Sequence, residues 1–219
     1  DMVPVAFKVA ENHKVMLPFM INMDGYKLTH AYEPIDLLEQ ETVDEFLPSY
    51  DPPIYMTTKN PLTFGSYAPP QYYAEFRVAM QNAMDRARKE LENAYKEWAE
   101  ITGRDWGGHV VAENVEDAEL VAIAMGSLTG MVRDVVSELR TQGKKVGLLK
   151  IRTQRPFPIE EVRKALKNAE KILVFERAVS FGHEGPVGME VKSACFGLTP
   201  EFYSFAVGLG GRDIPREEI

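Results

Sequence analysis

The chain has 219 residues, of which 45% are hydrophobic, enough for one large domain or two small ones with packed cores. Its 33 acidic and 25 basic residues argue against a general nucleic-acid binder, because such proteins need a basic face. The single cysteine, Cys195, excludes a disulfide framework within these residues, and it also excludes a cysteine-ligated cluster or zinc site built from them alone. No apolar run reaches the roughly 20 residues that span a bilayer. We therefore expect a cytoplasmic protein with no membrane association.

The first part of the chain predicts a helix followed by a buried strand. Residues 1–12 carry apolar side chains at helical spacing, and the mostly apolar run from Val15 to Met23 is typical of a buried strand. From residue 31 to 61 the periodicity fades and prolines accumulate, which indicates a long connection. One helix and one strand cannot close a core by themselves, so we expect this part to belong to a larger folded body.

A polar loop follows the predicted strand. It carries Asp24, Lys27, Thr29 and His30, and we take Asp24 and His30 as candidates for a position close to catalytic chemistry. A β-turn built on Asp24 and Gly25 accounts for the same residues without a function. The sequence leaves both readings open.

The middle of the chain predicts one long helix from Pro70 to about Ile101. Phe76, Met80, Ala83 and several later residues recur at intervals of three and four, which gives a narrow apolar stripe. At about 1.5 Å per residue the helix would reach roughly 45 Å, so we expect it to brace one domain against the next or against a neighbouring subunit. Glycines at 103, 107 and 108 indicate a domain boundary.

The last part predicts an open α/β sheet of about four parallel strands. The apolar run 121–125, a glycine-rich turn, an amphipathic helix and the strand 146–151 make one right-handed crossover unit. Ser127 stands at the expected N-cap of that helix and Gly143 at its left-handed C-terminal position. The pattern repeats with a helix after Pro158, a strand at 172–175, a helix at 186–196 and a strand at 202–207.

The carboxyl ends of these strands gather most of the candidate site residues. Gly126 and Ser127 lie where backbone N–H groups and a helix dipole bind anions, although we favour capping and close packing as the reason for these residues. Each further polar residue follows a predicted strand: Arg152, Arg155, Glu176, Arg177, His183, Arg212 and Asp213. Arg152, Arg177 and Arg212 are candidates for a partner interface, against the alternative of solvated or mutually paired charges. The four histidines are too scattered for a metal site.

Six motifs follow one another along the chain: Asp24-Gly25-Tyr26-Lys27-Leu28-Thr29-His30, Ala124-Met125-Gly126-Ser127-Leu128-Thr129-Gly130, the run 143–152, Arg155-Pro156-Phe157-Pro158, Glu176-Arg177-Ala178-Val179-Ser180-Phe181-Gly182, and Gly208-Leu209-Gly210-Gly211-Arg212-Asp213-Ile214. In this order and spacing they resemble the α subunit of pyruvate:ferredoxin oxidoreductase or of a close 2-oxoacid relative. The first motif has Tyr and Thr where that family has Phe and Ser.

The resemblance implies an α/β architecture in three parts. Residues 1–65 would be the C-terminal part of a pyrimidine-binding-type thiamine-diphosphate domain, 66–104 a helical linker, and 105–219 a domain similar to the transketolase C-terminal domain. The family's activating glutamate and substrate-binding residues would lie in a part that precedes this sequence, so no catalytic residue is carried over.

The resemblance also implies an activity and partners. The implied activity is the oxidative decarboxylation of a 2-oxoacid, most simply pyruvate. The reaction uses coenzyme A and gives acyl-coenzyme A, CO2 and reduced ferredoxin. Thiamine diphosphate with Mg2+ would be shared with a partner subunit, the iron–sulfur clusters would lie in other subunits, and this part alone would be inactive. The alternatives are a non-oxidative transketolase-type subunit and a non-catalytic α/β interaction module.

Overall fold

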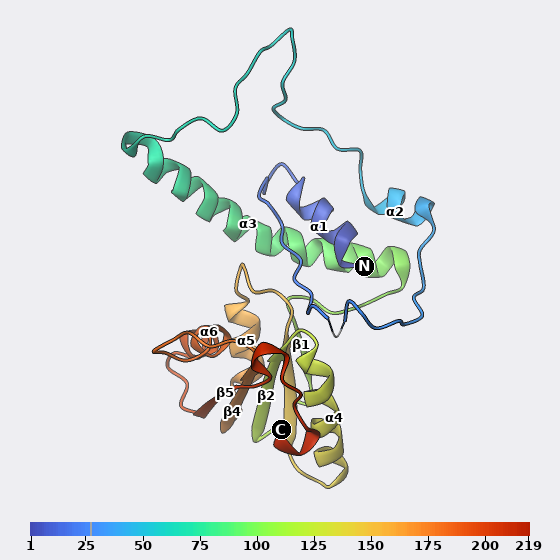
Figure 1. Ribbon diagram of the computed structural model, residues 1–219, viewed down its shortest axis with the longest axis vertical. Helices are drawn as coiled ribbons and strands as arrows, with labels where there is room; N and C mark the ends of the chain where they lie inside the picture. Colours follow the sequence, from blue (N-terminus) through green and yellow to red (C-terminus); the bar gives the residue numbers. More distant parts are fainter. Residues whose placement is uncertain (27) are drawn as a thin grey trace. The chain divides into compact units, whose positions relative to one another are not determined.

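The apolar run Leu120–Met125 forms β2, the central strand of a five-stranded sheet with the order β1-β3-β2-β4-β5 (Figure 1). β2 pairs in parallel with β3 (Val146–Ile151) and β4 (Lys171–Glu176), and β4 pairs in parallel with β5 (Glu201–Ala206). The prediction of four parallel strands is confirmed. The short strand β1 (Val110–Glu113) was not predicted, and it runs antiparallel along the free edge of β3.

The computed structural model describes residues 1–26 and 28–219, which fall into two units. The α/β unit comprises residues 23–31 and 107–219, and the helical unit comprises residues 1–22 and 32–106. The loop that carries Asp24 thus belongs to the α/β unit. The boundaries expected near residues 65 and 104 stay predictions.

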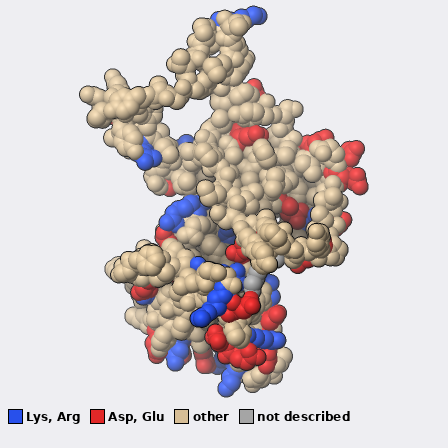
Figure 2. Space-filling model, in the orientation of Figure 1, with Lys and Arg blue, Asp and Glu red and all other residues tan. Residues whose placement is uncertain are grey.

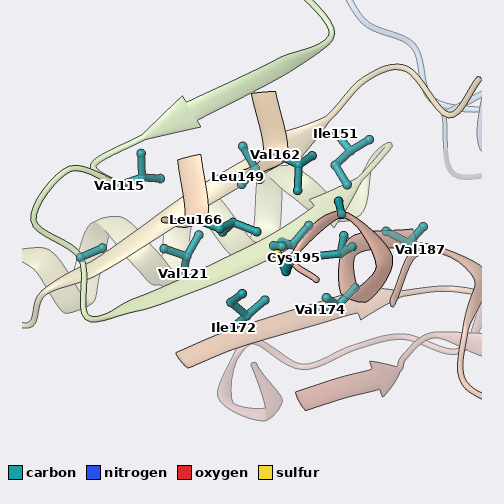
Figure 3. Close-up of a cluster of buried hydrophobic side chains, with 14 residues drawn as sticks. Val115, Val121, Leu149, Ile151, Val162, Leu166, Ile172, Val174, Val187 and Cys195 are labelled. Carbon is teal, nitrogen blue, oxygen red and sulfur yellow. The ribbon is translucent and has the colours of Figure 1, made fainter. Parts of the chain in front are cut away.

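Helices cover both faces of the sheet, and side chains alternate between two cores. Helices α5 (Ile159–Leu166) and α6 (Pro186–Ala194) cover one face, where Val121, Ile123 and Leu149 are fully buried (Figure 3). Helix α4 (Leu128–Thr141) covers the other face, packed on Ala122, Ala124 and Leu148. Two short 3-10 helices, Leu209–Gly211 and Arg216–Glu218, follow the last strand. The predicted starts of α4, α5 and α6 are confirmed, and α6 ends two residues before its predicted end at residue 196.

Three helices form the helical unit: α1 (Met2–Ala10), α2 (Gln40–Phe46) and α3 (Pro70–Thr102). The three helices share one core, whose buried side chains are Val5, Val9, Val15, Phe46, Ala87, Leu91, Ala94, Tyr95 and Trp98. The rings of Phe46 and Trp98 meet edge to face with centroids 4.9 Å apart, a favoured aromatic geometry. The prediction of a helix at the start of the chain and of a long helix from Pro70 is confirmed.

The predicted strand from Val15 to Met23 is wrong: this segment has no regular secondary structure. A strand requires a neighbour to accept its backbone hydrogen bonds, and the helical unit has no strand among its described residues. Instead, Val15 is buried among the three helices, and Leu17 and Phe19 pack against the same core while being partly buried. The apolar character of the run predicts its burial but does not determine its backbone conformation.

Helix α3 buries its apolar stripe along only part of its length. Ala83, Leu91 and Trp98 are buried, whereas residues 70–82 are all exposed, including Phe76 and Met80 of the predicted stripe. Residues 48–69, which precede the helix, have neither helix nor strand. Among residues 1–26 and 28–219, no helix combines the length and apolar character needed to cross a bilayer.

Candidate functional site at the carboxyl edge of the sheet

Three side chains from distant parts of the sequence meet at the carboxyl edge of the sheet. Asp24 lies on the loop of the α/β unit, Ser127 directly precedes α4, and Arg177 directly follows β4. The Ser127 backbone N–H donates to Asp24 Oδ2 at 3.2 Å, and Arg177 Nη1 lies 3.4 Å from the same oxygen. Arg177 Nη1 also donates to Ser127 Oγ at 3.0 Å. The structure thus brings together three predicted site residues that the sequence separates by up to 153 positions.

Ser127 occupies the predicted N-cap position, but its side chain does not cap the helix. Its hydroxyl accepts from Arg177 instead, and the Asp24 carboxylate accepts the N–H at the start of α4. Gly126 has a φ of +63°, which favours glycine, and a Cβ there would lie 3.6 Å from Asp24 Oδ2. A carboxylate is well placed at the positive end of a helix dipole. The anion position predicted for Gly126 and Ser127 is therefore filled by the chain's own Asp24.

Hydrogen bonding from Ser127 lowers the pKa of the Asp24 carboxyl below its ordinary value of 3.8, and the charge of Arg177 lowers it further against the opposing effect of partial burial. Because the folded pKa is depressed, this group stabilises the folded state above pH 3.8, and that contribution is lost as the pH falls through the folded pKa. We expect an NMR titration of Asp24 to show a midpoint below 3.8. A midpoint at or above that value would contradict the contact with Ser127.

The rest of the loop exposes its polar groups. His30 is exposed; its Nδ1 lies 3.0 Å from Thr29 Oγ1, and its ring centroid is 4.9 Å from that of Tyr26. The His30 backbone N–H donates to the Tyr26 carbonyl at 2.9 Å, which closes the loop on itself. Lys27 lies outside the described residues. The structure therefore brings Asp24 to the sheet edge and leaves His30 accessible on the same loop.

The predicted interface arginines have different surroundings. Arg152 Nη1 donates to the Gly108 carbonyl at 2.9 Å and also to the Gly107 carbonyl, whereas Arg212 is exposed. The Nε donor of Arg177 is buried and has no hydrogen-bond partner among the residues the structure describes. Their role in a partner interface stays a prediction.

Charges of both signs intermingle on the α/β unit. Figure 2 shows Lys and Arg side chains lying among Asp and Glu side chains on the face in view. Arg155 pairs with Glu190, and Arg140 Nη2 lies 2.8 Å from Asp117 Oδ1. Such exposed or half-exposed pairs contribute little to stability.

Glu176, at the end of β4, has a structural role that the sequence did not predict. Its side chain is 4% exposed, and its two carboxylate oxygens accept the N–H groups of Val187 at 3.0 Å and Gly188 at 2.9 Å. These N–H groups belong to the first turn of α6. A Cβ on Gly185 would lie 2.1 Å from Glu176 Cδ, so glycine there makes room for the carboxylate. Glu176 is thus the cap of α6 and is unavailable to a ligand.

One sequence signal pointed to this cap. The start of α6 reads Gly185-Pro186, with no Ser, Thr, Asp or Asn to accept the first free N–H groups, so the acceptor must come from another part of the chain. The buried contact between His109 Nδ1 and Thr153 Oγ1, at 3.1 Å, carried no such signal. Cys195 is buried, as predicted, and burial raises the pKa of its thiol.

Two family models match the chain in succession. The family described as "Pyruvate flavodoxin/ferredoxin oxidoreductase, thiamine diP-bdg" matches residues 1–96, and "Pyruvate:ferredoxin oxidoreductase core domain II" matches residues 118–219. A solved structure of 2-oxoglutarate:ferredoxin oxidoreductase from Magnetococcus marinus aligns with a TM-score of 0.41 and 21% identity, covering 68% of this chain and 23% of that one.

Curated relatives match over the whole chain. Proteins named pyruvate synthase subunit PorA are 42% identical in Methanosarcina barkeri and in Methanothermobacter thermautotrophicus, with 100% of this chain covered and 55% and 56% of theirs. A ketoisovalerate oxidoreductase subunit VorA from Pyrococcus horikoshii is 40% identical, with 100% and 56% covered. The chain spans about half the length of these relatives. The resemblance seen in the sequence motifs is confirmed: the chain belongs to the pyruvate:ferredoxin oxidoreductase family, among its α-type subunits.

Proposed function

We propose that this chain is part of the α subunit of a 2-oxoacid:ferredoxin oxidoreductase that acts on pyruvate. The observation that carries the proposal is the 42% identity to two pyruvate synthase subunits along the complete chain. The reaction would convert pyruvate and coenzyme A to acetyl-coenzyme A and CO2, with two electrons passed to ferredoxin. Because the chain spans about half of each relative, we assign this activity to the assembled enzyme.

The family implies thiamine diphosphate, which would supply the electron sink for decarboxylation. The described residues do not fit the diphosphate and Mg2+ end of this cofactor. Within residues 1–26 and 28–219, no group of three or more His, Cys, Asp or Glu side chains is placed to hold a metal ion, and the helix N-terminus at Ser127 is filled by Asp24. We therefore propose that the cofactor, with Mg2+, is bound chiefly by residues outside this sequence, including those of a partner subunit.

In this proposal the chain serves as scaffold and interface. With one cysteine, its 219 residues cannot supply the four cysteine ligands typical of an iron–sulfur cluster, so we assign the clusters to other subunits. Ferredoxin and coenzyme A would be engaged through the complex in the cytoplasm. The contacts to the other subunits would include Arg152, Arg177 and Arg212.

A branched 2-oxoacid is the second candidate substrate, because the ketoisovalerate oxidoreductase subunit is almost as similar to this chain, at 40% identity. The test is to purify the native complex that contains this chain and to follow ferredoxin reduction with coenzyme A. We expect a higher kcat/KM with pyruvate than with 3-methyl-2-oxobutanoate. The reverse order would transfer the assignment to the branched substrate, and no reduction with either substrate would overturn the proposed activity.

A further inference from the structure

The loop of residues 23–26 and 28–31 falls in one family match and in the compact unit that holds the other match. It lies within residues 1–96, which match the thiamine-diphosphate-binding model, yet it belongs to the α/β unit, which holds the match to core domain II.

Asp24 makes the contacts that attach the loop. Its carboxylate accepts from the Ser127 N–H and pairs with Arg177, whereas the hydrogen bond of His30 N–H to Tyr26 and the contact of His30 with Thr29 stay inside the loop. The attachment uses two independent sources of positive charge, the start of α4 and the Arg177 guanidinium. Gly126, which precedes Ser127, has a left-handed backbone that favours glycine.

We propose that Asp24 is a positioning residue: it fixes the loop to the carboxyl edge of the sheet and so places His30 at that edge in the assembled enzyme. The catalytic consequence of this placement rests on the function proposed above, whereas the attachment itself does not. Asp24 acts through the loop that it anchors, and its side chain is engaged with Ser127 and Arg177 rather than left free for a substrate.

The experiment measures hydrogen–deuterium exchange of peptides covering residues 23–31 in the complete complex. In Asp24→Ala we expect exchange of this loop to rise at least about threefold, because a segment without its anchoring contact opens more often. Asp24→Asn keeps an oxygen that can accept from Ser127 and loses the charge, so it should lie between the wild type and alanine. Because a combined Asp24→Ala/Arg177→Gln variant removes no further attachment, its exchange should match that of Asp24→Ala.

Asp117→Asn is the matched control. It neutralises an aspartate that pairs with Arg140 at 2.8 Å in the same unit, and the loop should exchange as in the wild type. Unchanged loop exchange in Asp24→Ala, or an equal rise in Asp117→Asn, would overturn the attachment. If Asp24→Ala fails to assemble, the same comparison is made with Asp24→Asn.

Measuring turnover distinguishes a positioning role of Asp24 from a purely structural capping role. We expect Asp24→Asn to lower kcat with pyruvate and to leave KM within about twofold, because the loop is displaced while the substrate site is intact. His30→Ala should lower kcat in the same way. A looser loop with unchanged kcat in both variants would overturn the placement of His30. A wild-type complex that reduces no acceptor with any 2-oxoacid would refute the proposed function, and the exchange result would still decide the attachment.

Discussion

Replacing Glu176 by alanine is expected to lower the free energy of unfolding of the α/β unit by about 3 kcal/mol. The change removes the helix cap and so leaves the Val187 and Gly188 N–H groups without an acceptor, which costs about 1–3 kcal/mol for each group that stays buried. Hydrogen exchange of the α6 and β4 amides measures the effect, because it reports on this unit separately from the helical unit.

Glu119→Ala is the matched control for Glu176→Ala. Glu119 is an exposed glutamate of the same unit and pairs with Lys145 at 2.8 Å, a solvent-exposed contact that contributes little to stability. Glu176→Gln keeps one carbonyl acceptor and places an NH2 group against the other donor, so its loss should be intermediate. Equal effects of the two alanine substitutions would contradict the buried cap.

Replacing Trp98 by alanine is expected to destabilise the helical unit by about 3–5 kcal/mol, the usual cost of removing a buried aromatic side chain. Trp98 is 3% exposed and packs against Phe46, which is fully buried. Hydrogen exchange of α1 and α3 measures the loss. Trp98→Phe should cost less, because it keeps an aromatic ring and removes a buried indole N–H that has no hydrogen-bond partner among the described residues.

Trp106 supplies the control for this second prediction. It belongs to the same unit and is 56% exposed, so Trp106→Ala should change the stability by no more than about 0.5 kcal/mol. Small and equal effects of Trp98→Ala and Trp106→Ala would mean that α1, α2 and α3 do not share the core described above.

Buried side chains of residues 1–65 share a core with α3. Val5, Val9, Val15 and Phe46 pack in a cluster whose other buried members come from α3. Further along, Ile35, Leu37 and Tyr55 remain more than half exposed. The expectation that residues 1–65 belong to a larger folded body stays a prediction.

Local sequence patterns were sufficient to predict most helices and strands of the α/β unit. The runs at β2, β3 and β4 are short, apolar and bounded by glycine or charged residues, so their conformation follows from burial on both faces of a parallel sheet. Gly143, with a φ of +80°, ends α4 as predicted, since few other residues adopt that conformation. Val15–Met23 has the same apolar character and is not a strand, because pairing depends on a neighbour that a local pattern cannot reveal.

By itself the sequence determined the parallel sheet, its crossover helices, the long helix α3 and the family, since each depends on periodicity, capping residues or motif order along the chain. Only the tertiary structure decided that Asp24 and Glu176 supply the acceptors at the starts of α4 and α6, in place of Ser127 and of any residue local to α6. The physical reason is that an unpaired helix N–H specifies the need for an acceptor but not its position in the sequence, and packing brings the acceptor from 103 residues away in one case and 11 in the other.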